Sequence, residues 1–207
     1  MARIGLFPLE LVLVPTERVP LNIFEPRYRE LIGECLDRDQ EFGIVLQSER
    51  GAIRHVGTRA RVSEVLQVLP DGRMHVVVEG GDRFRLLEVD HDRSFDVGVV
   101  EDVVDDGDEP EPADVLRVAE TFARLQQTLG APGQPPDPSS ATFDFEIAAR
   151  VDFAPETKQE LLELTSPRDR IARLAVMLDR AVEAVTIDRE LRARAHGNGK
   201  VSPPETR

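Results

Sequence analysis

One short amphipathic helix is predicted near the start of a stretch that otherwise carries β-strand signals. Glu25-Pro26 opens this helix, because proline at the first helical position lacks only a donor that would have no partner there. Apolar residues then recur at helical spacing, and charged residues occupy the opposite face. The apolar face consists of Tyr28, Leu31, Ile32, Cys35 and Leu36. A single helix of this kind among strands predicts the plug of a small β-barrel.

The segments around the helix are short apolar runs separated by turn residues. A hairpin is predicted over residues 62–78, since Pro70-Asp71-Gly72 supplies suitable turn chemistry. A second turn is expected at Gly80-Gly81-Asp82. Because the apolar residues change face between Leu86 and Leu87, a bulge or a strand that bends around a corner is expected there. Further strands are predicted at residues 4–14, where Pro8 indicates an edge position or a bulge, and at residues 42–46, 53–56 and 95–104.

The hydrophobic period changes to that of helices in the second half. Apolar spacing predicts a helix over residues 113–129. Residues 130–141 contain four prolines and two glycines, so they are expected to form an exposed loop that is either functional or mobile. Two short helices are expected at residues 143–151 and 155–164. A long helix is then predicted behind a capping box at Ser166-Pro167-Arg168-Asp169.

The net charge of −13 comes mainly from one connector. Eight of the residues from 101 to 115 are acidic and none is basic, whereas both flanking parts are close to balanced. Such a run is more often a solvated linker than a binding surface. It argues against nucleic acid as a partner, since phosphate binding needs a basic face. The predicted units are a β-barrel-like part (1–104), an acidic linker (105–112), a helical part (113–195) and a disordered tail (196–207).

Several spaced motifs occur together along the chain. Leu6-Phe7-Pro8-Leu9 is followed by the run PLNIFEPRY at residues 20–28, then by residues 42–46, 70–73, Arg83-Phe84 and, in the second half, residues 158–163. As a set, these motifs resemble the amino-terminal, substrate-binding domain of Lon proteases over roughly residues 4–185. The resemblance suggests a standalone bacterial member without the ATPase and peptidase domains. It implies an α+β fold, in which a PUA-like pseudo-barrel with one early helix precedes an α-helical bundle.

The residue pattern offers little for catalysis or metal binding. Lys158 and Lys200 lie in neither a P-loop pattern nor a family-like Ser-Lys context, so no ATPase or peptidase is expected. The four histidines are scattered and lack the spacing of metal ligands. Asp105 and Asp106 fall in the linker, where we do not expect them to be held rigidly enough for acid–base chemistry. No catalytic residue, cofactor or metal is therefore predicted.

Five residues are predicted to contact a peptide ligand, and they are Phe24, Arg27, Tyr28, Arg83 and Phe84. Each arginine could bind a ligand carboxylate. The commoner role of such an arginine is structural, bonding backbone carbonyls at the barrel rim or pairing with Glu25 or Glu34. The cleft between the two parts, near the acidic connector, is the favoured binding region because junctions of this kind commonly hold ligands.

The resemblance implies a non-catalytic recognition module that binds unfolded protein or peptide segments or a protein partner, with a protease among the candidates. A PUA-like nucleic-acid-binding protein is the first alternative, although a basic stripe with interleaved aromatics is missing. An enzyme of unknown type is the second. The sequence has neither a signal-peptide pattern nor the roughly 20 apolar residues that span a bilayer, so a cytoplasmic protein without membrane contact is expected. The single cysteine, Cys35, is expected to be a buried, inert thiol.

Overall fold

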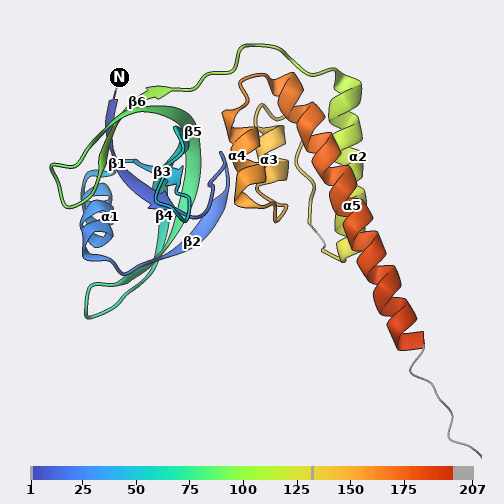
Figure 1. The fold of residues 1–207 in the computed structure, drawn as a ribbon, viewed down its shortest axis with the longest axis horizontal. Coiled ribbons are helices and arrows are strands. Elements are labelled where there is room, and N and C mark those ends of the chain that lie inside the picture. Colours follow the sequence, from blue (N-terminus) through green and yellow to red (C-terminus); the bar gives the residue numbers. More distant parts are fainter. Residues whose placement is uncertain (1, 132, 198–207) are drawn as a thin grey trace, which may run out of the picture.

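The computed structural model describes residues 2–131 and 133–197. This part of the chain has a mixed α+β fold, as predicted, with strands in the first half and helices in the second (Figure 1). The strands are β1 (Ala2–Leu9), β2 (Arg18–Ile23), β3 (Phe42–Leu46), β4 (Val56–Val68), β5 (Met74–Asp90) and β6 (Val97–Asp102). The helices are α1 (Pro26–Arg38), α2 (Pro112–Leu129), α3 (Phe143–Ala148), α4 (Pro155–Glu163) and α5 (Pro167–Gly197).

The strands form one sheet that closes on itself. Their order is β2-β5-β4-β3-β1-β6, and β5 also pairs with β6. Closure is possible because β5 is 17 residues long and changes partners along its length. Residues 74–79 pair with β2, and residues 84–90 pair with β6. A register shift between Leu86 and Glu88 confirms the predicted bulge. The barrel is therefore as expected, whereas its PUA-like classification stays a prediction.

The first strand is shorter than predicted, because the chain leaves the sheet after Leu9. Val12 and Val14 nevertheless remain buried, since they pack against the helical half. Pro8 does not lie on an edge strand, because β1 runs between β3 and β6. It is tolerated because β6 pairs only with residues 2–5 and leaves that side of Pro8 without a ladder partner. Of the strand expected at 53–56, Ile53 forms only an isolated bridge with Gln47, and Val56 belongs to the start of β4.

The β4–β5 hairpin has the predicted turn. The backbone N–H of Leu69 donates to the carbonyl of Arg73 at 2.8 Å, and Gly72 has a φ of 83°, which suits glycine. The turn expected at Gly80-Gly81-Asp82 is wrong, because β5 continues through it. A Cβ atom on Gly80 would lie 2.2 Å from the carbonyl oxygen of Val14. Glycine is needed here for the close approach of two chain segments rather than for a turn.

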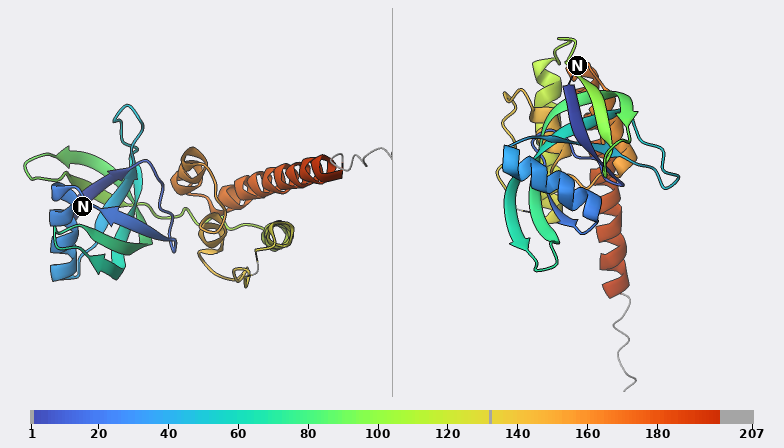
Figure 2. Two further views of the ribbon diagram at one scale, coloured as in Figure 1. Left: turned by 90° about the horizontal axis from the view of Figure 1, so that it is seen from below. Right: turned by 90° about the vertical axis from the view of Figure 1, so that its left-hand side faces the viewer.

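Helix α1 covers one end of the barrel and begins at Pro26, as predicted (Figure 2). Tyr28, Leu31, Ile32 and Cys35 are buried in the same core as the inner faces of β2, β3 and β5. Burial raises the pKa of the Cys35 thiol to about 11, so the thiol stays protonated at neutral pH. Leu36, which was also expected on the apolar face, is instead exposed.

The helical half is built on the packing of α2 along α5, and α5 continues past the end of α2 (Figures 1 and 2). The backbone N–H of Asp169 donates to Ser166 Oγ at 3.0 Å, which is the predicted cap of α5. The described residues of the 130–141 loop form neither helix nor strand, in agreement with the prediction. Residues 196 and 197 belong to α5 rather than to a tail, and the rest of the predicted tail lies outside the described residues.

One hydrophobic core extends across both halves. It contains Val12, Val14 and Val56 from the barrel side together with buried residues of all four later helices. Leu161 and Leu162 of α4 belong to this core and are almost fully buried. The predicted division of the chain at residues 104 and 113 stays a prediction, because side chains from both sides of it pack in the same core.

We predict that Leu31→Ala lowers the free energy of unfolding by about 2–5 kcal/mol, because it leaves a cavity under α1. Leu31 is 2% exposed, and its Cδ1 fills the space above Gly5. Leu36→Ala is the matched control on the same helix, since Leu36 is 41% exposed and should lose less than about 1 kcal/mol. Urea denaturation measures both. Equal losses would contradict the role of α1 as a plug.

Candidate functional site

The predicted ligand-contacting residues near α1 divide between the surface and the core. Phe24 is 59% exposed. Arg27 is also exposed, and its Nε donates a hydrogen bond to Glu25 Oε2 at 2.9 Å. Tyr28 is buried against Phe7, with ring centroids 4.1 Å apart, and the Arg27 guanidinium lies over its ring. Only Phe24 and Arg27 of this group are therefore accessible to a partner in this structure.

Arg83 and Phe84 lie inside the protein and away from Phe24. Phe84 is fully buried in the barrel core with Val45 and Leu86. Arg83 Nη1 donates to the backbone carbonyls of Leu162 at 2.9 Å and Leu164 at 2.6 Å. Arg83 therefore has the structural role considered above, in which an arginine bonds backbone carbonyls. The carbonyls belong to Leu162 of α4 and to Leu164, just after α4. The five predicted residues do not form one cluster.

Arg83 belongs to a buried charge network at the junction of the two halves. The network consists of Arg83, Asp105, Asp144 and Arg170. Arg170 binds Asp105 through two bonds of 2.7 and 2.6 Å, and its Nε donates to Asp144 Oδ2 at 2.5 Å. Asp105 also pairs with Arg83. Both guanidinium groups lie over the Phe145 ring, at 5.3 and 4.7 Å from its centroid.

Within this network, the neighbouring charges outweigh burial in setting the pKa values of Asp105 and Arg170. Burial alone would raise the pKa of Asp105, but the hydrogen bonds and positive charges of Arg170 and Arg83 outweigh it, and the pKa lies below its ordinary value. Burial would lower the pKa of Arg170, yet Asp105 and Asp144 raise it overall. The expectation that Asp105 sits in a solvated linker is therefore wrong, because two buried arginines hold it in place.

A second set of polar contacts attaches α4 to the barrel. Lys158 Nζ binds Glu17 Oε1 at 2.5 Å, and both side chains are largely buried. Gln159 Nε2 donates to the carbonyl of Val56 at 3.0 Å. Arg54 holds both oxygens of Glu163 at 2.8 Å. The segment 158–163, which carried part of the family resemblance, thus forms the interface between the halves.

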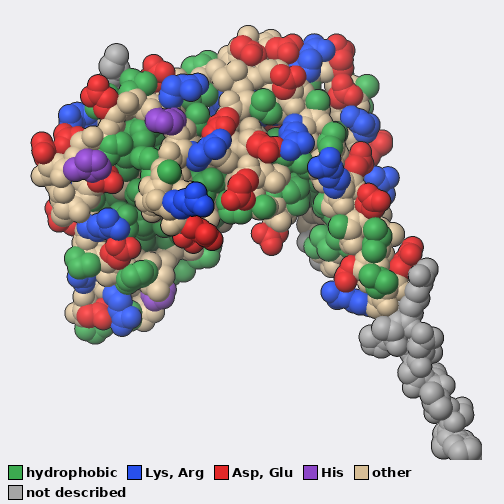
Figure 3. All heavy atoms as spheres, viewed as in Figure 1, with side chains coloured by type: hydrophobic (Ala, Val, Ile, Leu, Met, Phe, Trp, Pro, Cys, Tyr) green, Lys and Arg blue, Asp and Glu red, His purple; other side chains and the backbone are tan. Residues whose placement is uncertain are grey.

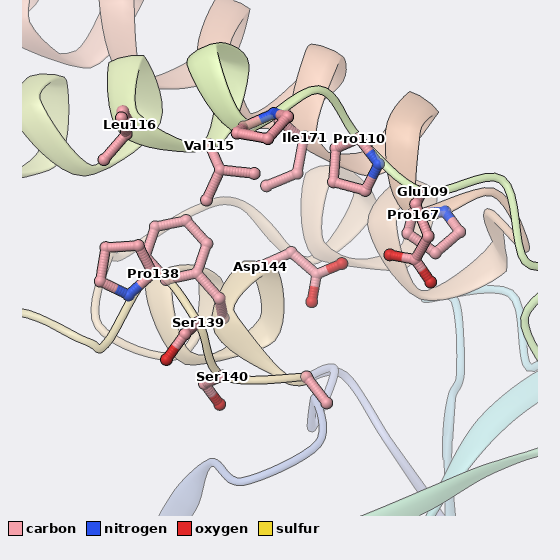
Figure 4. A pocket seen from close by; sticks show the side chains of 13 residues that line it. Glu109, Pro110, Val115, Leu116, Pro138, Ser139, Ser140, Asp144, Pro167 and Ile171 are labelled. Atoms are coloured by element: carbon pink, nitrogen blue, oxygen red, sulfur yellow. The ribbon is translucent and has the colours of Figure 1, made fainter.

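The connector leads into a pocket on the helical side of this junction. Its volume is about 460 Å³, and it is lined by the connector, the start of α2, the 138–141 segment, α3 and the start of α5. Figure 4 shows Leu116 and Pro138 at one end and the carboxylates of Asp144 and Glu109 turned toward one another at the other end, beside Pro167. The pocket lies near the connector, but it is not the cleft expected between the two parts, because its walls come from the connector and the helical half and none from the barrel.

The lining of the pocket is mainly apolar and stiff. Four prolines contribute to it: Pro110, Pro112, Pro138 and Pro167. Proline has a fixed φ and no backbone N–H, so these walls are rigid and offer few donors. Asp144 is not available as a free base, because Arg170 binds its Oδ2 and the N–H of Phe145 donates to its Oδ1 at 2.7 Å. The pocket is suited to holding an apolar group rather than to acid–base chemistry.

Arg170 and Asp144 were not predicted as members of any site. The sequence contained one usable signal, since Arg170 lies four residues before Leu174 on the apolar stripe of α5. A charged residue on a buried helix face requires a buried partner. The identity of that partner could not be read, because Asp105 is 65 residues away in the chain.

A second pocket, of about 450 Å³, lies beside α1 and contains several arginines. Arg3 pairs with Asp90, Arg38 with Glu34, Arg59 with Asp102 and Arg93 with Glu30 and Glu34. These ion pairs neutralise the arginines, so the pocket does not provide the uncompensated basic surface that binds phosphates.

The described residues offer neither a metal site nor a membrane-spanning helix. In residues 2–131 and 133–197, no three His, Cys, Asp or Glu side chains are grouped as a metal site requires. No helix in the same ranges is both long and apolar enough to cross a bilayer.

Known proteins with a similar sequence or fold share this architecture. Residues 3–180 match the family described as the ATP-dependent protease La (LON) substrate-binding domain. The Lon proteases of Solibacter usitatus and Escherichia coli are 26% and 23% identical over 93% and 92% of this chain. The chain spans about a quarter of the length of these relatives, 26% in both cases.

Solved structures agree with this match. A Lon N-terminal domain protein from Xanthomonas campestris superposes with a TM-score of 0.66 and 26% identity, over 85% of this chain and 98% of that one. The N-terminal domain of a Mycobacterium avium complex Lon protease has the same fold, with a TM-score of 0.65 and 15% identity over 86% of this chain and 98% of that one. The fold and the match over most of its length define a Lon-type amino-terminal domain. This chain belongs to the LON substrate-binding domain family.

We predict that Arg170→Leu lowers the free energy of unfolding by about 3–5 kcal/mol, because it leaves Asp144 buried without its cation. Arg170 is 1% exposed. The matched control is Arg168→Leu, two residues earlier, whose exposed side chain pairs with Asp108 and should contribute less than about 1 kcal/mol. Urea denaturation distinguishes the two. Similar losses would show that the buried network does not hold the halves together.

The lowered pKa of Asp105 predicts a loss of stability in acid. Its stabilising contribution is complete above the unfolded pKa of about 3.9 and disappears as the pH falls through the lower folded pKa. The free energy of unfolding of Asp105→Asn should therefore fall less steeply below about pH 4 than that of the wild type. Asp82→Asn, at an exposed position on the barrel, should retain the wild-type slope. Denaturant titrations between pH 7 and pH 2.5 measure this, and parallel slopes in all three proteins would contradict it.

Proposed function

We propose that this chain is a non-catalytic recognition module that binds unfolded or extended polypeptide segments, with the pocket of about 460 Å³ receiving an apolar side chain. The observation that carries the proposal is the open, proline-walled apolar lining of this pocket. A rigid concave surface is favourable for binding an extended peptide, because the protein loses little conformational entropy and only the peptide must be ordered.

Membership of the family supports the same role. The family is described as a substrate-binding domain, and the curated relatives are named Lon proteases. The relatives named as proteases are about four times as long as the region that matches this chain. For this chain we therefore propose recognition alone. Cooperation with a protease, and a cytoplasmic location, belong to the same proposal.

The surface near α1 is a second proposed contact for the same ligand. Ile23 and Val68 both pair with Met74 on neighbouring strands, which places Phe24 and Val68 at one end of the sheet. Phe24, Leu66 and Val68 are all exposed apolar side chains. Exposed apolar side chains close together favour contact with another apolar chain. Of the five residues predicted from sequence, Phe24 and Arg27 are kept in this proposal.

We predict that Leu116→Ser weakens binding of an unfolded protein about fivefold to tenfold, because it removes part of the apolar lining. Leu129→Ser is the matched control, since both leucines lie on α2 and are 55% exposed, but only Leu116 lines the pocket. The assay is fluorescence anisotropy with a labelled, reduced and unfolded protein, with and without ATP. Wild type and Leu129→Ser should bind alike, and ATP should have no effect.

Three results would contradict this proposal. Equal binding of the same labelled protein in its folded form would remove the requirement for an extended segment. Equal weakening by the two leucine substitutions would place the binding site elsewhere. Tighter binding of RNA than of any peptide would favour the nucleic-acid alternative.

A further inference from the structure

The proposed peptide pocket is chemically different at its two ends. Leu116 and Pro138 form an apolar end, whereas the carboxylates of Glu109 and Asp144 converge at the end beside Pro167 (Figure 4). The Asp144 carboxylate is already bound by Arg170. The Glu109 side chain is exposed, and none of the described residues forms an ion pair or hydrogen bond with it. Glu109 can therefore accept a donor from a ligand.

The surroundings reinforce the negative charge at this end. Asp106, Asp108, Glu111, Asp114 and Asp169 lie on the connector and in the first turns of α2 and α5, and acidic side chains gather there in the surface view (Figure 3). The nearby cations are fewer. Arg168 is shared between Asp108 and Glu111, and Arg117 lies 4.0 Å from Asp114. The rim of the pocket thus carries an excess of negative charge.

We propose that the pocket selects peptide segments in which lysine or arginine lies two residues from a large apolar residue, because these two side chains point to the same side of an extended peptide. The apolar side chain occupies the end near Leu116, and the basic side chain reaches Glu109. This inference rests on the proposed function and adds the class of segment that is bound. Lysine and arginine suit the position because their aliphatic stems pack along the proline walls while the cation stays at the wetted rim.

The argument is one of charge complementarity. An uncompensated carboxylate at the edge of an apolar pocket favours a cation and disfavours a second anion. Glu109 is exposed, so the gain is limited by solvent and reduced by salt, whose screening length is about 10 Å at 0.1 M. A modest preference of about twofold to fivefold at low salt follows from an exposed charge-assisted contact.

The test uses the full chain and pairs of labelled peptides that differ at one position. Each peptide is acetylated and carries one central leucine or phenylalanine, with lysine, glutamine or glutamate two residues after it. At low salt the lysine peptide should bind about twofold to fivefold more tightly than the glutamine peptide, and the glutamate peptide should bind most weakly. Glu109→Gln should remove the lysine preference and leave affinity for the glutamine peptide unchanged. Glu88→Gln, at an exposed site on the barrel, makes the same change in net charge and should keep the preference.

Other outcomes would overturn the inference in distinguishable ways. Equal binding of the lysine and glutamine peptides by the wild type would overturn it and leave the proposed function intact. A preference that persists unchanged in Glu109→Gln would locate the charge recognition elsewhere. A non-acetylated peptide with an apolar first residue that binds more tightly than the lysine peptide would identify a chain terminus as the occupant instead. If none of the peptides binds, both the proposed function and this inference are wrong.

Discussion

The arrangement of the two halves depends on the pairing of buried arginines with carboxylates at their junction. Arg83 comes from the barrel and Arg170 from α5, and both bind Asp105 of the connector. A buried guanidinium without a partner is strongly unfavourable, so the halves must meet in an arrangement that pairs every charge. Such networks do not by themselves imply high stability, but their directional bonds favour one geometry over others that apolar packing alone would tolerate. The apolar core around Leu161 and Leu162 supplies the burial that makes this pairing necessary.

The features that could be predicted from the sequence are those with a local cause. Pro26 opens α1, Pro70-Asp71-Gly72 turns the hairpin, and the prolines between residues 130 and 141 prevent regular structure, because each acts on its own backbone. The features that were missed depend on distant segments. Gly80 resembled a turn residue, but its role is to let the carbonyl of Val14 approach β5. Arg83 and Phe84 were predicted to contact a peptide ligand, but they are buried by α4 and by closure of the barrel.

The acidic connector shows how composition can mislead about structure. As a run of like charges it has the composition of a solvated linker, yet its backbone and side chains are bound to the start of α5. The N–H of Asp106 donates to the carbonyl of Thr165 at 3.0 Å, and Asp108 accepts bonds from Ser166 and Arg168. Part of the connector's negative charge is therefore neutralised by contacts within the protein, as in the pair of Asp108 with Arg168. These contacts also hold the backbone of the connector beside the pocket, which Glu109 lines.

One residue, Asp144, belongs both to the pocket and to the charge network at the junction of the two halves, so the proposed binding site depends on that network. Asp144 lines the pocket and at the same time binds Arg170, which holds Asp105 and through it Arg83 of the barrel. This wall of the pocket is therefore held by the same bonds that orient the two halves, so it need not be ordered when a ligand enters, and the entropic penalty of binding falls mainly on the ligand. Burial separates two roles of the same chemical group. The buried carboxylate of Asp144 and the half-buried carboxylate of Asp105 position the fold, while the exposed carboxylate of Glu109 is free to distinguish between ligands.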